Sequence, residues 1–237
     1  MKLSKKPYKG TRDFFPPNQR IHDYLVETMT LTAESFGYEH YNGPLLEEVD
    51  LYRAKSGEEL INDQIYSFID RGNRNVAIRP EMTPTLARMV AATHRETSKP
   101  IRWFSIPNLF RYERPQRGRL REHWQFNCDI FGADAQMGEL EIIQLAVSLL
   151  ERFGANSDHF EVRINDRHIV DHIFLNLLQL NQEQAYQLIK VVDRSKKIGP
   201  EKTLEAVEQI GLNNQQTIIF TQYLNIKHFN DLHEFLV

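Results

Sequence analysis

The sequence predicts an α+β domain followed by a small helical unit. Up to residue 165, short segments with the two-residue period of strands alternate with turn residues and helical stretches, which is typical of an antiparallel β-sheet flanked by helices. From Asp166 onward, leucine- and isoleucine-rich stretches at helical spacing take over, with polar breaks at Gly199-Pro200 and at residues 211–214. We therefore expect one domain at residues 1–165 and a helical one at residues 166–237.

A helix is predicted to begin at Pro16-Pro17 and to end at Gly37, a residue type favoured at helix C-termini. The apolar positions that recur at helical spacing are Ile21, Tyr24, Leu25, Thr28 and Leu31. Residues 38–48 are expected to be extended. Pro44 interrupts them and has no N–H to donate, so this strand should lie at a sheet edge or carry a kink.

A hairpin, two helices and further strands are predicted between residues 64 and 165. Residues 64–70 and 75–79 flank a turn at residues 71–73. Thr83 is expected to cap the next helix, with Pro84 in its first turn. Strands near residues 101–106 and 109–113 precede a basic loop and a return strand that ends at Phe131. An amphipathic helix over residues 134–153, stopped by Gly154, and a strand over residues 160–165 complete the domain.

Composition excludes several classes of protein. Hydrophobic residues make up 41% and charged residues 26% of the chain, which argues against disorder. The net charge of −3 excludes a protein that holds nucleic acid by bulk charge alone. No apolar run approaches the roughly 18 residues that a membrane span needs. The lone Cys128 makes neither an intramolecular disulfide nor a zinc site. We expect no resident metal, no membrane contact and a cytoplasmic location.

A row of polar residues stands out in the return strand. Read with a period of two, His123, Gln125, Asn127 and Asp129 share one face, whereas apolar residues share the other. Asn, Asp and Gln are poor strand formers, so their repetition indicates either a binding surface or simply the solvated face of a half-buried sheet.

The preceding strand and loop carry arginines. Arg111 and Glu113 lie two positions apart, and the loop that follows holds Arg114, Arg117, Arg119 and Arg121. Guanidinium groups bind phosphate oxygens in a bidentate manner, so this hairpin has the chemistry of a phosphate clamp. A solvated run of charges is the alternative.

A second candidate cluster spans residues 79–84. Glu81 suits the positive end of a helix dipole and Thr83 suits a helix cap, which is a structural reading of both residues. It does not exclude a binding role, because strand-to-helix junctions often line binding sites.

Together these segments resemble the histidyl-tRNA synthetases, a family of class II aminoacyl-tRNA synthetases. Residues 9–16 look like the family's N-terminal signature, and the helix with the Pro44 strand is similar to motif 1, the dimer-forming element. Residues 110–129 are similar to motif 2, and residues 79–84 look like the histidine-binding junction. Residues 163–167 and the helices after them resemble the start of the helical insertion domain. The resemblance implies a class II antiparallel β-sheet flanked by helices, followed by part of that insertion domain.

The resemblance also implies roles for individual residues. Arg111 matches the catalytic arginine that holds the α-phosphate of ATP, Glu113 a carboxylate near the adenine, and Arg121 another ATP-contacting arginine. His123 stands where the family places an aromatic residue, often Phe, under the adenine ring. The implied histidine-binding residues are Glu81, Met82 (through its backbone), Thr83, Gln125 and Asp129. The residues implied for the loop at the tRNA acceptor end are Arg114, Arg117 and Arg119.

The implied reaction activates histidine with ATP to histidyl-adenylate and transfers the histidyl group to tRNA(His). Magnesium is implied as a bridge between ATP phosphates, and a second copy of the chain as a dimer partner through motif 1. Nothing in the sequence resembles the family's second histidine motif, motif 3 or the anticodon-binding domain. The chain is therefore expected to be an N-terminal part of the enzyme, with little or no activity alone.

Two rival interpretations come from other functional classes. One is a catalytically silent paralogue, the regulatory subunit of ATP phosphoribosyltransferase in histidine biosynthesis. The other is an accessory binding module that acts through partners or RNA. Arg111, Glu113, Arg121 and the basic loop favour the ligase, because a ligand sensor has no need to bind ATP or to meet tRNA.

Overall fold

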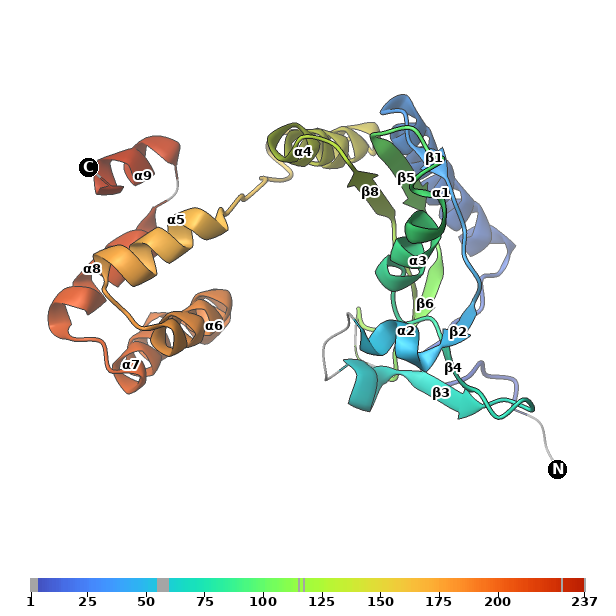
Figure 1. The fold of residues 1–237 in the computed structure, drawn as a ribbon, viewed down its shortest axis with the longest axis horizontal. Helices are drawn as coiled ribbons and strands as arrows, with labels where there is room; N and C mark the ends of the chain where they lie inside the picture. Colours follow the sequence, from blue (N-terminus) through green and yellow to red (C-terminus); the bar gives the residue numbers. More distant parts are fainter. Residues whose placement is uncertain (1–3, 55–59, 115, 117, 227, 237) are drawn as a thin grey trace. The chain divides into compact units, whose positions relative to one another are not determined.

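A computed structural model describes residues 4–54, 60–114, 116, 118–226 and 228–236 (Figure 1). The chain divides into two compact units, unit 1 at Met1–Glu161 and unit 2 at Val162–Val237. This division falls slightly ahead of the boundary expected at residues 165–166.

In the described residues of unit 1, helices are combined with three small sheets, whose strand orders are β1-β5-β8, β2-β4-β3 and β6-β7. The helices are α1 (Pro16–Ser35), α2 (Val49–Arg53), the π-helical turn η1 (Leu60–Gln64), α3 (Thr83–Thr93) and α4 (Ala135–Arg152). The strands are β1 (Glu39–His40), β2 (Leu46–Glu48), β3 (Tyr66–Ile69), β4 (Asn75–Ile78), β5 (Ile101–Ser105), β6 (Asn108–Phe110), β7 (Glu122–Trp124) and β8 (Asn127–Phe131). The predicted hairpin over residues 64–79 is confirmed, since β3 and β4 pair antiparallel.

One long bent hairpin organises the unit. β5 pairs with β8 and β6 pairs with β7, with Ser105 opposite Asn127 and Asn108 opposite Trp124. Both halves keep one register, because equal numbers of residues separate the paired positions on the two strands. The predicted return strand is nevertheless interrupted at Gln125, whose N–H donates to Pro107 O at 3.1 Å.

The strand predicted over residues 109–113 is also shorter than expected. β6 ends at Phe110. The N–H of Glu113 donates to Arg111 O at 2.7 Å, and this tight turn ends the extended run. Arg111 N still donates to Arg121 O at 2.9 Å, so the hairpin pairing reaches Arg111.

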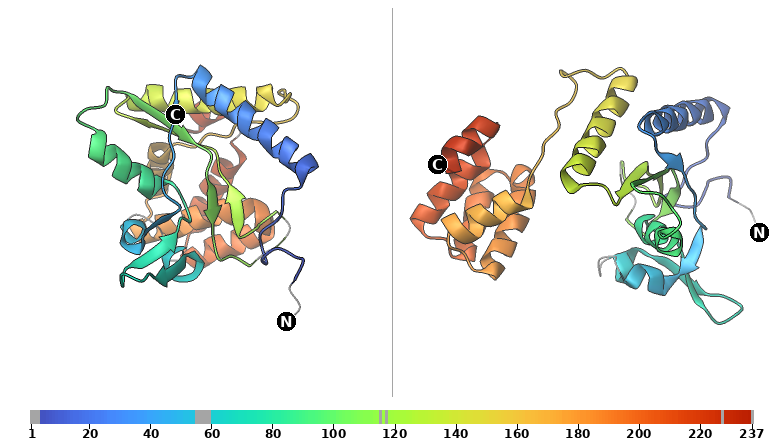
Figure 2. Two further views of the ribbon diagram at one scale, coloured as in Figure 1. Left: turned by 90° about the vertical axis from the view of Figure 1, so that its right-hand side faces the viewer. Right: turned by 45° about the horizontal axis from the view of Figure 1, so that its top comes forward.

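Helices cover both faces of the sheet β1-β5-β8 (Figure 2). α1 and α4 lie side by side on one face, where Ala33, Phe104 and Leu145 are buried together. α3 covers the other face, where Met82 and Leu86 pack with residues of β5 and β8. The odd-numbered positions of β8, including Asp129, therefore face α3.

The bounds of α1 agree with the prediction, but its buried face does not. Ile21, Tyr24 and Leu31 are 61%, 54% and 51% exposed, whereas Thr32 and Ala33 are the buried residues of the helix. Small side chains near its C-terminus make the close contact with the sheet. The apolar stripe thus lies on the surface of unit 1.

Two local predictions are wrong. Met82 occupies the N-cap position and Thr83 is the first residue of α3. Met82 O accepts from Leu86 N at 2.9 Å, so the first helical turn closes one residue earlier than expected. Residues 160–165 form no strand, because no described strand lies beside them to supply hydrogen bonds.

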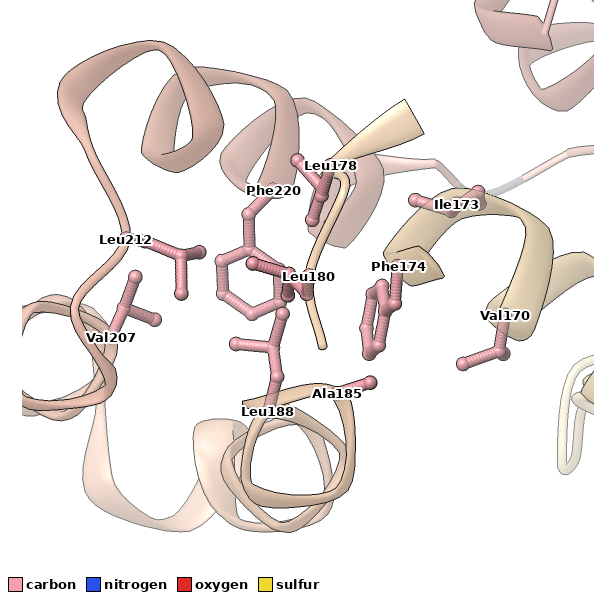
Figure 3. Packing of buried hydrophobic residues seen from close by; sticks show 10 residues of the cluster. All are labelled: Val170, Ile173, Phe174, Leu178, Leu180, Ala185, Leu188, Val207, Leu212 and Phe220. Carbon is pink, nitrogen blue, oxygen red and sulfur yellow. The ribbon is translucent and has the colours of Figure 1, made fainter. Parts of the chain in front are cut away.

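Unit 2 is helical. Its elements are α5 (Arg167–Asp171), the π-helical turn η2 (His172–Leu177), α6 (Gln182–Ile198), α7 (Pro200–Ile210), α8 (Asn214–Asn225) and α9 (Phe229–Leu236). The polar breaks lie between helices as predicted: Gly199 separates α6 from α7, and Gly211 ends α7 in the left-handed conformation. Phe174, Leu188 and Phe220 are fully buried in the apolar core that these helices share (Figure 3).

None of the described helices is both long enough and apolar enough to cross a membrane.

Candidate active site

Arg111 lies directly against the junction that precedes α3. Its Nε donates to Pro80 O at 3.0 Å. Phe110 N donates to Arg79 O at 3.0 Å, so the end of β6 and residues 79–80 run alongside each other. Two motifs that are about thirty positions apart in the sequence therefore meet at one place.

The hydrogen bond to Pro80 uses only Nε of Arg111, so the two terminal nitrogens of its guanidinium can bind another group. Among the described residues, no hydrogen bond or ion pair of these nitrogens is found beyond the Nε bond to Pro80. The side chain is half-buried. A cation held through Nε, with its two amino groups left over, has the geometry of a bidentate phosphate ligand.

His123 and Glu113 share the electrostatic environment of Arg111. Burial lowers the pKa of the His123 imidazole, the charge of Arg111 lowers it further, and Glu113 opposes the shift. Neutral imidazole is thus the favoured form. The Glu113 carboxylate forms an ion pair with Arg119 of the basic loop, so two residues expected to serve ATP and tRNA contact each other here.

Asp129 is a buried carboxylate for which the described residues supply no cation. Burial alone raises its pKa, and among the described residues no ion pair or hydrogen bond of its side chain is found. It lies opposite Trp103 in the pairing of β5 with β8, and Trp103 packs against the cluster that contains Met82. Asp129 is therefore on the same face of the sheet as the junction at residues 79–84.

Gln125, also in the expected set, is exposed and donates from Nε2 to Asn127 Oδ1 at 2.8 Å. At the junction itself, Met82 is a core residue whose side chain is 2% exposed, so only its backbone is left to meet a ligand. Glu81 is half-buried and Thr83 is exposed.

Arg121 is held by protein groups on several sides. Its Nε donates to Glu113 O and its Nη1 to Tyr8 Oη, both at 3.0 Å. Its guanidinium carbon lies 4.0 Å from the centre of the Tyr112 ring and 5.6 Å from that of Tyr8. With 8% exposure it is an internal residue of unit 1, which its sequence position in a basic loop did not indicate.

The loop arginines differ in their surroundings. Arg114 and Arg119 are exposed. Gln116 and Arg119 bond to each other through both backbone N–H groups, at 3.0 and 2.9 Å, which closes the tip of the loop. Arg117 lies outside the described residues.

Sequence reasoning missed Tyr8, and it included Arg79 in the cluster at residues 79–84 without giving it a role of its own. Tyr8 approaches Arg121 from the N-terminal segment, and Arg79 is 6% exposed and bonded to two other segments of the chain. No periodic pattern marks either residue, because both act through contacts between segments that are distant in sequence.

A family model described as histidyl-tRNA synthetase matches residues 10–233. The histidine–tRNA ligase of Leptospira biflexa is 49% identical over 92% of this chain and 50% of its own length. That of Thermoplasma volcanium is 42% identical over 88% of this chain and 48% of its own length. The chain thus spans about half the length of these curated relatives.

Solved structures show the same fold. Histidyl-tRNA synthetase from Nostoc sp. PCC 7120 superimposes with a TM-score of 0.85 at 22% identity, covering 98% of this chain and 52% of that one. A Bacillus halodurans C protein described as an ATP phosphoribosyltransferase regulatory subunit/histidyl-tRNA synthetase gives 0.78 at 18% identity, covering 100% of this chain and 63% of that one. Both likenesses confirm the predicted fold class.

At these identities the solved structures show the fold alone. The match to the family model and to the curated sequences shows the family, because it extends over most of the chain. The chain belongs to the histidyl-tRNA synthetase family.

Proposed function

We propose that this chain carries the part of a histidine–tRNA ligase active site that binds histidine and the α-phosphate of ATP. The hydrogen bond from Arg111 Nε to Pro80 O is the observation that supports this most, because it joins the phosphate-binding candidate to the histidine-binding junction. Asp129 on the same face supplies an acceptor for an imidazole N–H.

In this proposal the histidine carboxylate attacks the α-phosphorus of ATP, and pyrophosphate leaves. Arg111 stabilises the negative charge on the phosphoryl oxygens through its terminal N–H groups, which is an electrostatic role without proton transfer. His123 and Glu113 lie toward the adenine, and Arg121 fixes the Glu113 backbone. A site that hydrogen-bonds its substrate in this way rejects apolar analogues by about 10⁴-fold.

Magnesium would come to this site with the nucleotide. Within the described part of the chain, no three His, Cys, Asp or Glu side chains form a group that could hold a metal ion. Phosphate oxygens are the preferred ligands of Mg²⁺ in such sites, and the ion would neutralise part of their charge.

The tRNA and the second copy of the chain occupy other surfaces in this proposal. Exposed Arg114 and Arg119, with Arg117 between them in the sequence, suit the phosphates of the tRNA(His) acceptor end. The exposed apolar stripe of α1 suits a second copy, because large apolar surfaces of this kind are usually covered by a partner.

The regulatory subunit of ATP phosphoribosyltransferase is the second candidate, since a protein described by both names has the same fold. Such a subunit would bind histidine without ATP. Titration calorimetry of the purified chain with histidine and with Mg·ATP separates the two. We expect binding of both ligands, and at least about tenfold weaker ATP binding for Arg111→Gln.

The matched control is Arg102→Gln. Arg102 forms an ion pair with Glu141 of α4 at 2.7 Å, on the face of the sheet opposite to Asp129. Its loss should therefore leave ATP binding unchanged. Histidine binding without ATP binding would favour the regulatory subunit, and binding of neither would overturn the proposal. Rapid histidine-dependent pyrophosphate exchange would contradict the expectation that the chain alone has little activity.

A further inference from the structure

Arg79 is a buried cation to which the described residues offer no countercharge. Its side chain is 6% exposed, and in the described part of the chain no carboxylate forms an ion pair with it. Burial lowers the pKa of its guanidinium. An unpaired buried charge is costly unless hydrogen bonds satisfy it, so its position calls for a specific role.

Neutral acceptors on two other segments satisfy the guanidinium. Nε donates to Asn108 O and Nη2 to Asn108 Oδ1, both at 2.9 Å. Nη1 donates to Gly43 O at 3.0 Å and to Asn42 Oδ1 at 3.4 Å. The side chain therefore ties the loop before β2 to the first residue of β6.

The backbone of Arg79 extends the same connection. Its N–H donates to Leu45 O and its carbonyl accepts from Phe110 N, both at 3.0 Å. Phe110 directly precedes Arg111 in the chain, and Pro80 directly follows Arg79. Arg111 Nε donates to Pro80 O. The contact between Arg111 and Pro80 thus lies one residue beyond the backbone bond between Phe110 and Arg79 on both segments.

We propose that Arg79 is a positioning residue that holds Arg111 against Pro80 and so aims its terminal N–H groups at the α-phosphate. The inference rests on the phosphate-binding role proposed for Arg111. The side chain of Arg79 lies with that of Asn108, on the side of β6 opposite to Arg111. In this proposal it does not touch the nucleotide. A guanidinium carries five N–H donors on three nitrogens in a planar fork, whereas lysine has three donors on a single nitrogen, so lysine cannot reach the acceptors on both segments.

A double-mutant cycle tests this coupling. The dissociation constant for Mg·ATP is measured for the chain, for Arg79→Lys, for Arg111→Gln and for the double variant. Arg79→Lys should weaken binding roughly tenfold in the unmodified chain, the size expected for one misplaced charge-assisted hydrogen bond. In the Arg111→Gln background the same change should have no further effect.

The matched control is Arg88→Lys. Arg88 pairs with Glu47 at 2.6 Å and its side chain is 44% exposed, and among the described residues no hydrogen bond joins it to β6 or Pro80, so ATP binding should not change. Equal weakening by Arg79→Lys in both backgrounds would overturn the proposal, and so would no weakening at all.

A readout without ATP separates this inference from the proposed function. In ¹H–¹⁵N spectra of the arginine side chains, the Arg111 Nε–H should be protected from solvent exchange and its signal should vanish in Arg111→Gln. Protection should be lost in Arg79→Lys and reduced in Asn108→Ala, which keeps Arg79 and removes one acceptor. If the chain binds no ATP, the proposed function fails, whereas unchanged protection in both variants would overturn the positioning role.

Discussion

At the scale of single residues, surroundings rather than residue type decide what the polar groups of unit 1 can do. Arg111 and Arg121 are both arginines of one hairpin, with backbones that pair directly. Arg121 is occupied by Tyr8, Glu113 and the Tyr112 ring, whereas the terminal nitrogens of Arg111 have no partner among the described residues. Of these two arginines, Arg111 can therefore bind a phosphate without first breaking protein contacts, and Arg121 cannot.

Asp129 should show a trade-off between stability and binding. Its pKa is raised by burial, so the folded state holds its proton more tightly than the unfolded state does. The free energy of unfolding therefore falls as the pH rises from 3.8 through the raised pKa. Asp129→Asn should restore this stability at neutral pH, because asparagine stays uncharged. We expect a higher melting temperature, by roughly 2–4 °C per 1 kcal/mol regained, together with weaker histidine binding.

Calorimetric melting at several pH values checks this prediction. The gain of Asp129→Asn should disappear below pH 3.8, where both proteins carry a neutral side chain. Asp50→Asn serves as the control, because Asp50 is 82% exposed in its ion pair with Arg53 and should change the melting temperature little. A variant less stable than the parent at pH 7 would show that the Asp129 carboxylate has a favourable partner.

At the scale of elements, the N-terminal segment supports the bent hairpin. Gly10 O accepts from Arg121 N at 2.7 Å and from Glu122 N at 3.2 Å. Gly10 has φ +91, and a Cβ there would lie 2.7 Å from Arg121 Cγ. Both the backbone conformation and the space require glycine, which explains why the segment can pass so close to Arg121.

Gly10→Ala should therefore destabilise unit 1 more than an ordinary glycine replacement does. Gly37 is the matched control, with φ +79 and nothing within 4 Å of an added Cβ. We expect a loss of about 1 kcal/mol for Gly37→Ala, from backbone strain alone, and about 2–4 kcal/mol for Gly10→Ala, where overpacking adds to the strain. Urea unfolding measures both, and equal losses would mean that Arg121 simply moves aside.

At the scale of the whole molecule, α1 presents apolar side chains that unit 1 does not bury. Ile21 and Leu31 are 61% and 51% exposed, although their spacing is that of a helix face made for a core. A second copy of the chain is the partner that we propose for this stripe. A twofold interface would use each residue twice, so substitutions there should have large effects.

The double substitution Ile21→Gln with Leu31→Gln should convert a dimer to a monomer. Losing two buried apolar side chains from each copy should raise the dimer dissociation constant at least about 10⁴-fold, at roughly 1.5–3 kcal/mol per side chain. Sedimentation velocity over a concentration series measures it. Leu204→Gln in α7, where Leu204 is 42% exposed, should leave association unchanged. An unmodified chain that stays monomeric at high concentration would contradict the dimer.

Local patterns in the sequence determined most of the elements. Helix α4 begins after the Asp134 cap and ends before Gly154, and Gly199-Pro200 separates two helices of unit 2, because caps and breakers act over a few residues. The polar row with Asp129 was also visible in the sequence, since side chains alternate along a strand. The family follows from the same motifs, taken in order.

Only the tertiary structure decided which surfaces those elements share. It ended β6 at Phe110, left residues 160–165 without a strand partner and turned the apolar stripe of α1 outward. It also enclosed Arg121 and Arg79 and set Arg111 against Pro80. These outcomes depend on contacts between segments far apart in the chain, and no spacing within one segment records which other segment will lie beside it.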